Sequence, residues 1–309
     1  MIDLGFKALK LRFHRPDPWS DVEVVEAIRS EVGDTIELLV DANQNNFSKV
    51  YKFWSRRTAK QVARELDLLN VYFLEEPLPR NDVEGLAEIS ASVDMFIAGG
   101  EHTPTVDDFK SHLLTGAYDI LQPDITLAGN FGIIGLRKVS NVADFFGKLV
   151  IPHVTGNGNF FIMLAATLQA MATVDNCPMV EFPYDPPILI PETMQALLPK
   201  PIWIDADGTI EVPNQPGIGV EIDEGQLALD VSLAWEVVKR DKEVDSLKDQ
   251  VFRELLSYML EKPATIEGAL GLILISRHIE RIGDHATNIA EDVIFIVSGQ
   301  DVRHHGQEE

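Results

Sequence analysis

Three acidic residues in the first third of the chain each close a short, largely apolar run. Asp41 follows the run Ile36–Val40, and Glu75 and Glu101 stand at the ends of two later runs. An apolar run that stops at a carboxylate is typical of a buried strand whose last residue enters a polar site. Because buried carboxylates need a cation or a donor, and because three of them suit a hard cation, the pattern favours a Mg²⁺ site. The alternative is that acids follow strands only because loops are polar.

Other reactive side chains end the remaining apolar runs. Lys10 ends the first run, Asp124 and His153 end two consecutive later runs, and Glu181 ends the last. Asp124 and His153 would therefore occupy adjacent strand ends, where their side chains can pair. A carboxylate behind an imidazole fixes its tautomer and raises its pKa, which makes the histidine a usable general base near neutral pH. A single histidine is more often structural, but its place opposite three carboxylates favours a catalytic role.

Stretches with helical spacing separate these residues, so strands and helices alternate along the chain. Strands are predicted at residues 5–13, 36–41, 72–75, 95–101, 118–124, 149–153 and 179–182. Helices are predicted at residues 21–32, 59–69, 83–89, 106–114, 160–171 and within 132–146. The strand ends recur every 23 to 34 residues, close to one eighth of the roughly 250 residues typical of a (β/α)8 barrel.

Two α/β architectures fit this alternation. A barrel carries functional groups at the carboxyl ends of its strands, whereas a doubly wound open sheet concentrates its site at one switch point. Because a polar residue ends every predicted strand, we favour the α/β fold of a (β/α)8 TIM-type barrel.

The strand ends and the residues after them carry seven short motifs. These are Lys10-x-Arg12, Val40-Asp41-Ala42-Asn43-Gln44, Glu75-Glu76-Pro77, Gly100-Glu101, Gln122-Pro123-Asp124, His153 and Pro216-Gly217-Ile218-Gly219. In order and spacing they resemble the barrel domain of the enolase superfamily, in the branch of mandelate racemase and the acid-sugar dehydratases. The resemblance runs from about Gly5 to Glu224, and we assign residues 1–226 to this domain.

The resemblance implies a reaction. Enzymes of this superfamily hold a substrate carboxylate on Mg²⁺ while a Lys or His base removes the neighbouring C–H proton, which leaves an enolate-like dianion. The expected substrate is a small-molecule carboxylate, a sugar acid. By this resemblance the metal ligands are Asp41, Glu75 and Glu101, the catalytic residues are His153, Asp124 and Lys10, and the substrate-binding residues are Arg12, Asn43 and Glu181.

Arg12 departs from the racemase pattern. Racemases of this branch carry a second Lys at that position as the base for the opposite face, whereas a guanidinium stays protonated and is a poor base. A single His153–Asp124 pair can still remove the α-proton and then protonate a departing β-hydroxyl. The pattern therefore favours dehydration of an aldonate-type acid sugar over racemisation. The strand that ends at Asp124 carries no terminal Lys, which argues against the branch of muconate cycloisomerases and dipeptide epimerases.

The start of the chain predicts an incomplete barrel. Enolase-type proteins carry a capping domain and a first barrel strand before the region of Lys10, and the nine residues in front of it have room for neither. Exposed strand edges of such a barrel invite self-association.

The residues after Glu224 have a different pattern. Residues 227–260 form one long helical pattern, Lys262-Pro263 interrupts it, and residues 266–297 form a second. Two helices joined by a short loop are expected to pack antiparallel. The second helix carries apolar residues at a 3,4 spacing that predicts a bundle seam: Leu272, Ile275, Ile279, Ile282, Ala286, Ile289, Val293 and Ile296.

Acidic residues one turn apart occur on both tail helices. Asp241 and Asp245 form one pair, and Glu280 and Asp284 form the other. Such pairs are often only a solvated helix face. However, the run Arg277–Glu291 resembles the signature helix of PhoU, a regulator of phosphate uptake, and the match extends from about 230 to 304. For a PhoU-like segment at residues 227–309, the resemblance implies that these four acids bind a further metal, iron or similar, and that a phosphate transporter or sensor is the partner.

Composition excludes several classes of partner. The net charge of −23 repels nucleic acid and anionic membrane surfaces. Cys177 is the single cysteine, which predicts a reducing compartment, and the chain shows neither a signal peptide nor a run that could span a bilayer. We therefore expect a cytoplasmic protein without membrane insertion.

Three functional hypotheses remain open from the sequence. The first is a Mg²⁺-dependent dehydratase built on the strand-end residues. The second is a PhoU-like regulator of phosphate uptake that acts through the helical tail. The third is an inactive fusion of two truncated domains.

Overall fold

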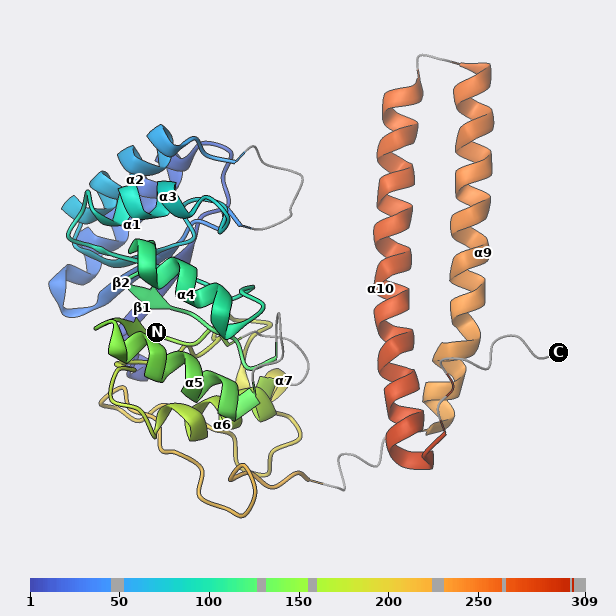
Figure 1. Ribbon diagram of the computed structural model, residues 1–309. Helices are drawn as coiled ribbons and strands as arrows, with labels where there is room; N and C mark the ends of the chain where they lie inside the picture. The colour runs from blue at the N-terminus through green and yellow to red at the C-terminus, as the bar shows by residue number, and fades with distance from the viewer. Residues whose placement is uncertain are drawn as a thin grey trace. The chain divides into compact units, whose positions relative to one another are not determined.

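A computed structural model describes residues 1–45, 53–126, 132–154, 160–223, 231–262 and 265–300, and residue 302. The chain divides into two compact units, Met1–Ile222 and Asp223–Glu309, each described by itself (Figure 1). Residues 227–230 of the first predicted tail helix lie outside the described residues, as do 230, 301, 303 and 304 of the PhoU-like match. No helix in the described part of the chain is both long and apolar enough to cross a membrane.

The first unit contains a parallel six-stranded sheet whose strand order follows the chain. The strands are β1 (Ala8–Arg12), β2 (Glu37–Asp41), β3 (Val71–Glu75), β4 (Phe96–Gly99), β5 (Ile120–Leu121) and β6 (Leu149–Val150). An isolated parallel bridge between Asp124 and His153 continues the pairing beyond β5 and β6. The predicted parallel α/β alternation is confirmed, and all carboxyl ends of the strands meet at one edge.

Helices connect successive strands. They are α1 (Pro18–Val32), α2 (Arg56–Leu68), α3 (Val83–Ser90), α4 (Val106–Thr115), α5 (Gly132–Phe145) and α6 (Phe160–Met171). Side chains of Asp17, Ser55, Asp82 and Thr105 accept hydrogen bonds from the first turns of α1 to α4, which sets where these helices begin. Two 3₁₀ turns, η1 (Ile2–Leu4) and η2 (Gly33–Thr35), and the short α7 (Pro191–Met194) were not predicted.

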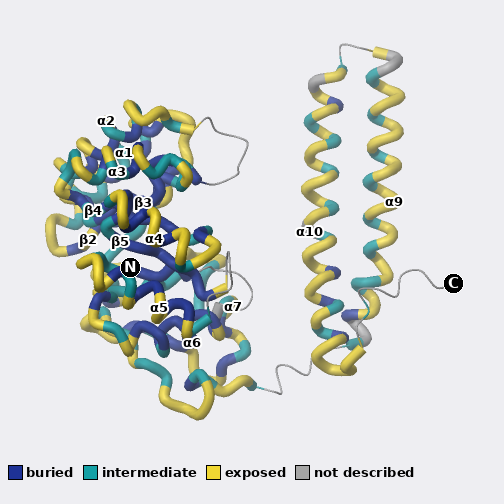
Figure 2. The backbone as a smooth tube through the Cα atoms, in the orientation of Figure 1, coloured by how far each residue is buried: buried dark blue, intermediate teal, exposed yellow. Residues whose placement is uncertain are grey.

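The two faces of the sheet bury different sets of side chains. On the outer face, residues such as Leu38 and Val40 join the large core under the helices. On the inner face, a separate cluster takes residues from successive strands, including buried Leu39, Phe73 and Ala98, and it extends to Met179. Because successive strand residues point to opposite faces, this alternation describes a barrel wall around its own filled interior. Figure 2 shows the buried strands inside helices whose outer surfaces are exposed.

The predicted strand at residues 179–182 is wrong. This segment has no ladder with the neighbouring two-residue strand β6. A single backbone bond, from Val150 N–H to the Asn176 carbonyl, ties this part of the chain to β6. Side chains instead join the segment to the start of the sheet, since Glu181 contacts Lys10 and Phe182 packs on Phe6.

The second unit is a hairpin of two long antiparallel helices, α9 (Val231–Glu261) and α10 (Ile266–Ser298). The predicted seam of α10 needs correction, because most of its described side chains are exposed. The exposed fractions are 53% for Leu272, 54% for Ile275, 58% for Ile279, 66% for Ile289 and 59% for Ile296. A stripe with small residues faces α9 instead: Ala269, Ala290 and Ile294 are buried, and a Cβ at Gly283 would lie 3.4 Å from Val244.

Candidate functional site

The site lies at the carboxyl edge of the sheet. Arg12, Asp41 and Glu75 end the adjacent strands β1, β2 and β3 and are register partners. Adjacent strands are about 4.8 Å apart, so the two carboxylates start from neighbouring backbone positions. Both carboxylates are buried, with 2% exposure at Asp41 and 1% at Glu75.

Lys10 is the central cation of the site. Its Nζ lies 2.9 Å from Glu75 Oε2 and also forms an ion pair with Glu181, 171 residues away in sequence. Burial by itself would lower the pKa of the Lys10 ammonium, but Glu181, Glu75 and Asp41 raise it well above its usual value. Burial likewise opposes ionisation of Glu75, yet Lys10 holds the Glu75 pKa below its usual value. Both groups are therefore charged at neutral pH.

The negative charge of Asp41 is offset less completely than that of Glu75. Burial first, and then the neighbouring Glu75, raise its pKa to about 7, against the opposing effect of Lys10 and Arg12. Arg12 Nε is 3.5 Å from Asp41 Oδ2. The backbone N–H of Asn43 donates to Oδ1 at 2.9 Å and its side-chain amide donates to Oδ2 at 2.7 Å. Asn43 thus lies against the first of the predicted metal ligands.

Glu76 is a member of the site that the sequence reasoning did not select. It is 1% exposed, and its backbone has a positive φ of 45°. Burial, followed by the charges of Glu101, Glu75 and Asp41, raises its pKa to about 9, and Asn45 Nδ2 donates to it at 3.0 Å. The signal was present in the motif at residues 75–77, but a strand pattern sends consecutive side chains to opposite faces, so Glu76 was not expected at the site.

His153 is held between two carboxylates. Its Nδ1 lies 2.7 Å from Asp124 Oδ2, and its Nε2 lies 3.1 Å from Glu101 Oε2. Asp124 is fully buried and is oriented by Thr126, whose N–H and Oγ1 lie 2.6 and 3.0 Å from its other oxygen. Burial disfavours the imidazolium, but Asp124, Glu181 and Glu101 outweigh it and raise the His153 pKa to about 9.

Glu101 and Glu181 complete the set of predicted residues. The second oxygen of Glu101, Oε1, lies 3.0 Å from Nε2 of His102, so both of its oxygens face imidazole rings. Glu181 contacts Lys10 through Oε1 and accepts the backbone N–H of Val154 at 3.1 Å through Oε2. The nine residues predicted for this site thus lie at the strand ends in three sets of direct contacts: Lys10 with Glu75 and Glu181, Arg12 and Asn43 with Asp41, and His153 with Asp124 and Glu101.

The carboxylates fit a hard cation by chemistry, although chain cations satisfy them in this arrangement. Within the described residues, no group of three or more His, Cys, Asp or Glu side chains is positioned to hold a metal ion. Lys10 lies against Glu75, Arg12 against Asp41, and imidazoles against Glu101. Burial first, and then the neighbouring carboxylates, nevertheless raise the pKa values of Asp41 and Glu76, so a bound cation would favour the ionised form of both. Oxygen-only ligands with excess negative charge are the donor set that Mg²⁺ takes.

The acidic residues predicted on the tail are arranged differently. Lys248 Nζ lies 3.1 Å from Glu280 Oε1 and 3.4 Å from Asp245 Oδ1, so an ammonium bridges the two helices. Asp241 lies against Gly283, and Asp284 is exposed. A further metal on Asp241, Asp245, Glu280 and Asp284 finds no support in the described part of the hairpin.

Comparison with known proteins agrees with this geometry. Residues 1–226 match the family model described as "Enolase C-terminal domain-like". The chain belongs to this family. Residues 225–293 match the PhoU domain, so both resemblances drawn from the motifs are confirmed.

Individual members of the enolase C-terminal domain-like family resemble the first unit. An arabinonate dehydratase from Saccharolobus solfataricus is 30% identical over 224 residues, which are 72% of this chain and 55% of that protein. The crystal structure of L-talarate dehydratase from Polaromonas sp. JS666, complexed with Mg and L-glucarate, matches with a TM-score of 0.57 and 30% identity over 72% of this chain and 54% of that chain. The chain therefore spans about half the length of these enolase-type proteins.

The hairpin resembles a different protein. A phosphate-specific transport system accessory protein PhoU homolog from Pseudomonas aeruginosa is 51% identical over 77 residues, which are 25% of this chain and 32% of that protein. This chain thus has a barrel-type α/β unit followed by a PhoU-like helical region.

Proposed function

We propose that the strand-end site removes the proton next to the carboxylate of a sugar acid and then expels the β-hydroxyl, in a Mg²⁺-dependent dehydration. The observation that carries the proposal is His153, fixed by Asp124 at one ring nitrogen and facing the carboxylate network with the other. The enolase-type relatives named as dehydratases of arabinonate and L-talarate support this class of substrate.

Asp41, Glu75 and Glu101 would hold the metal, with Asn43 orienting Asp41. When bound, Mg²⁺ supplies the positive charge that stabilises the enolate-like dianion. The magnesium in the L-talarate dehydratase structure supports this assignment.

The other residues act on the substrate and its protons. Lys10 is charged in this site and would neutralise the substrate carboxylate, while Arg12, whose side chain is 66% exposed, would reach the sugar chain. Because Asp124 occupies Nδ1 of His153, the nitrogen that exchanges protons is Nε2. The neutral form of His153, the minor form below its pKa of about 9, would take the α-proton. Once protonated, His153 would return the proton to the departing β-hydroxyl, with Glu181 as a hydrogen-bond acceptor for substrate hydroxyls.

Single-base chemistry favours dehydration over racemisation. A racemase needs a second base on the opposite face of the substrate, and a guanidinium such as Arg12 keeps its proton. Elimination needs only one group that first accepts and then donates a proton.

The test is exchange of the substrate α-proton with deuterated solvent, followed by NMR over a panel of aldonates and aldarates with Mg²⁺. The parent should exchange the α-proton and release a 2-keto-3-deoxy acid. His153→Asn should lower both rates by about 10²–10⁴, whereas His285→Asn, at an exposed tail histidine, should leave them unchanged. Unchanged exchange in His153→Asn would exclude His153 as the base.

We also propose that residues 227–309 form a second domain with a regulatory role in phosphate uptake. The PhoU match and the division of the chain at Ile222 and Asp223 support this assignment. Binding of the full chain to the membrane-embedded phosphate transporter or its sensor kinase, measured in nanodiscs with and without phosphate, tests the role. No binding under either condition would count against it.

A further inference from the structure

Gln122 is a buried glutamine just beyond the carboxyl end of β5, and the proposed reaction gives it no role. Its exposed fraction is 0%, and its backbone N–H donates to the Gly99 carbonyl at 3.0 Å, which extends the pairing with β4. Ile120 belongs to the inner cluster of the barrel and Leu121 to the outer core. Because side chains alternate along a strand, the Gln122 amide therefore lies on the inner face.

Small residues on β4 let this amide reach a predicted metal ligand. Glu75 pairs with Ala98, and Ala98 pairs with Ile120, so Glu75 and Gln122 stand on strands two apart. The strand between them ends in Ala98 and Gly99, which carry at most a methyl group. Burial opposes ionisation of Glu75, whereas Lys10 and then Gln122 lower its pKa, so the amide lies close to this carboxylate.

The amide of Gln122 is nevertheless not satisfied within the protein. Neither its Nε2 nor its Oε1 has a well-formed hydrogen bond to any group in the described ranges of the chain. A buried donor or acceptor without a partner lowers the stability of the folded state. Such groups are found where a function requires them, because packing alone would favour an apolar side chain.

Gln195 shows how this chain uses a buried glutamine in a structural role. It is 2% exposed, its Nε2 donates to the Ile202 carbonyl at 2.9 Å, and its Oε1 accepts the Ile202 N–H at 2.6 Å. Its amide is thus satisfied at both ends by the loop that it closes. Of these two buried glutamines, the one at the strand-end site has the unpaired amide.

We propose that Gln122 is a positioning residue for Mg²⁺, whose amide nitrogen donates to Glu75 and orients this carboxylate toward the metal. The inference deepens the proposed function and rests on it. Lys10 Nζ lies 2.9 Å from Glu75 Oε2, but the proposed reaction assigns this ammonium to the substrate carboxylate. Another donor must then hold Glu75, and Gln122 supplies one without adding charge. Donors that contact a metal ligand rather than the metal typically account for about 10–100-fold in metal affinity.

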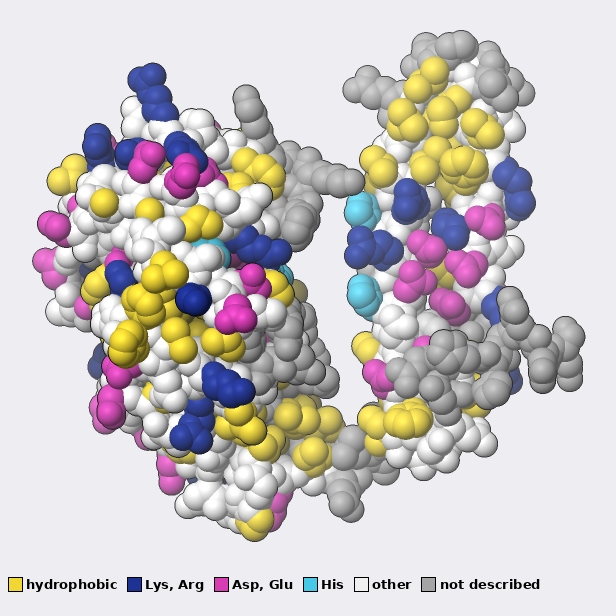
Figure 3. All heavy atoms as spheres, in the orientation of Figure 1, with side chains coloured by type: hydrophobic (Ala, Val, Ile, Leu, Met, Phe, Trp, Pro, Cys, Tyr) yellow, Lys and Arg dark blue, Asp and Glu magenta, His cyan; other side chains and the backbone are white. Residues whose placement is uncertain are grey.

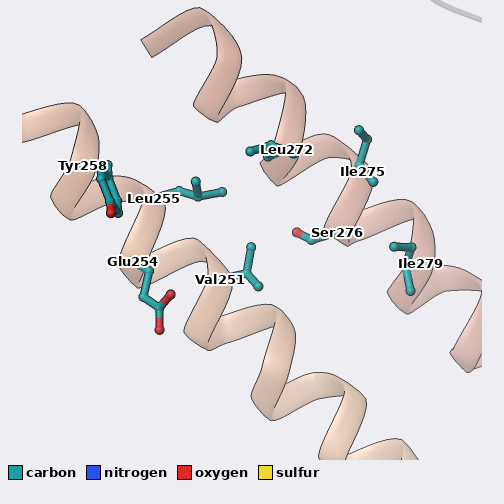
Figure 4. A pocket seen from close by; sticks show the side chains of 8 residues that line it. All are labelled: Val251, Glu254, Leu255, Tyr258, Leu272, Ile275, Ser276 and Ile279. Atoms are coloured by element: carbon teal, nitrogen blue, oxygen red, sulfur yellow. The ribbon is translucent and has the colours of Figure 1, made fainter. Parts of the chain in front are cut away.

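The groove of the hairpin is a poor competitor for the metal. This groove, near the loop end, has a volume of about 300 Å³ and is lined mainly by apolar side chains such as Leu255 and Ile275 (Figure 4). Hydrophobic side chains gather at that end in the space-filling view (Figure 3). Its lining includes one carboxylate, Glu254, and the hydroxyls of Tyr258 and Ser276. A Mg²⁺ ion bound by the full chain is therefore expected at the three strand-end carboxylates rather than in this groove.

The test measures two properties of the full chain in parallel: Mg²⁺ affinity by isothermal titration calorimetry, and the thermal midpoint of the metal-free protein in EDTA. Gln122→Met keeps the length of the side chain and removes the amide. It should bind Mg²⁺ about 10–100-fold more weakly. Its metal-free midpoint should stay unchanged or rise, because the substitution removes unpaired polar groups from a buried position.

Gln195→Met is the matched control and should do the opposite. Its Mg²⁺ affinity should equal that of the parent, whereas its metal-free midpoint should fall by about 5–10 °C, because two backbone groups of Ile202 lose their partners. Gln122→Asn separates the amide from its reach. This variant keeps an amide that is one methylene shorter, and it should also bind Mg²⁺ more weakly than the parent.

Failure of the inference and failure of the proposed function give different results. A parent chain that binds no Mg²⁺ would overturn the proposed function, and the inference with it. A parent that binds Mg²⁺, together with a Gln122→Met variant that binds it equally well, would overturn the inference alone. A Gln122→Met variant that does not fold, or whose metal-free midpoint falls as far as that of Gln195→Met, would identify Gln122 as a structural residue and also overturn the inference.

Discussion

The strand-end site and the helical hairpin treat charge and apolar surface in opposite ways. At the strand ends, buried carboxylates and Lys10 contact each other over large sequence separations, above an interior filled by the sheet itself. In the hairpin, ion pairs such as Lys248 with Asp245 are partly exposed, and large aliphatic residues of α10 are exposed to solvent. The first region therefore depends on its buried network, whereas the second keeps large aliphatic side chains on its surface.

Equivalent lysine substitutions should show the largest contrast between the two regions. Lys10→Met removes the cation from buried Glu75 and half-buried Glu181 and should destabilise the first unit by about 3–5 kcal/mol, the usual result of breaking a buried ion pair. Lys248→Met should cost clearly less, because its partner Asp245 is 53% exposed, although Glu280 is half-buried. Urea unfolding followed by circular dichroism measures both, and equal losses would show that the strand-end network is not buried in solution.

Truncation of an aliphatic side chain should cost more stability in the first unit than in the hairpin, and this is the second largest contrast. Leu74→Ala empties a fully buried position of β3 and should cost about 2–5 kcal/mol. Ile275→Ala, at a residue that is 54% exposed, should change stability by less than about 0.5 kcal/mol at concentrations too low for self-association. A large cost for Ile275→Ala in the dilute protein would mean that Ile275 is buried within one chain.

Magnesium should stabilise one region only. At about one hundred times its Kd, Mg²⁺ should add roughly 2.7 kcal/mol to the stability of the first unit. The shift in thermal midpoint should disappear in Glu101→Gln and persist in Glu280→Gln, which removes one of the tail carboxylates. Calcium chelation with EGTA beforehand controls for trace Ca²⁺. Loss of the shift in Glu280→Gln instead would place the metal on the hairpin.

The alkylation rate of the Cys177 thiol should differ from that of an exposed cysteine on the hairpin. Burial raises the pKa of the Cys177 thiol to about 11 from its usual 9.0. Because the thiolate is the reactive form, Cys177 should react with iodoacetamide at pH 8 about a hundredfold more slowly than a cysteine of ordinary pKa. Asn288→Cys in a Cys177→Ser background supplies that reference on the hairpin. The Cys177 rate should keep rising tenfold per pH unit above pH 9, where the reference rate levels off.

Local signals in the sequence were enough for most elements. Helices α1 to α4 begin after capping residues that act within one turn, and apolar runs mark the strands, so their positions were predicted to within a few residues. The neighbouring positions of Asp124 and His153 were also predictable, because consecutive parallel strands place their carboxyl ends side by side.

Tertiary structure decided what depends on contacts between distant residues. The positive φ of Glu76 turns this carboxylate into the site, and Glu181 reaches Lys10 from a segment that forms no strand. The sequence offered two heptad stripes on α10, and hydrophobicity pointed to the one with larger residues. The structure packs the other stripe on α9, because Ala269, Gly283 and Ala290 let two helix backbones approach closely, which bulky side chains prevent.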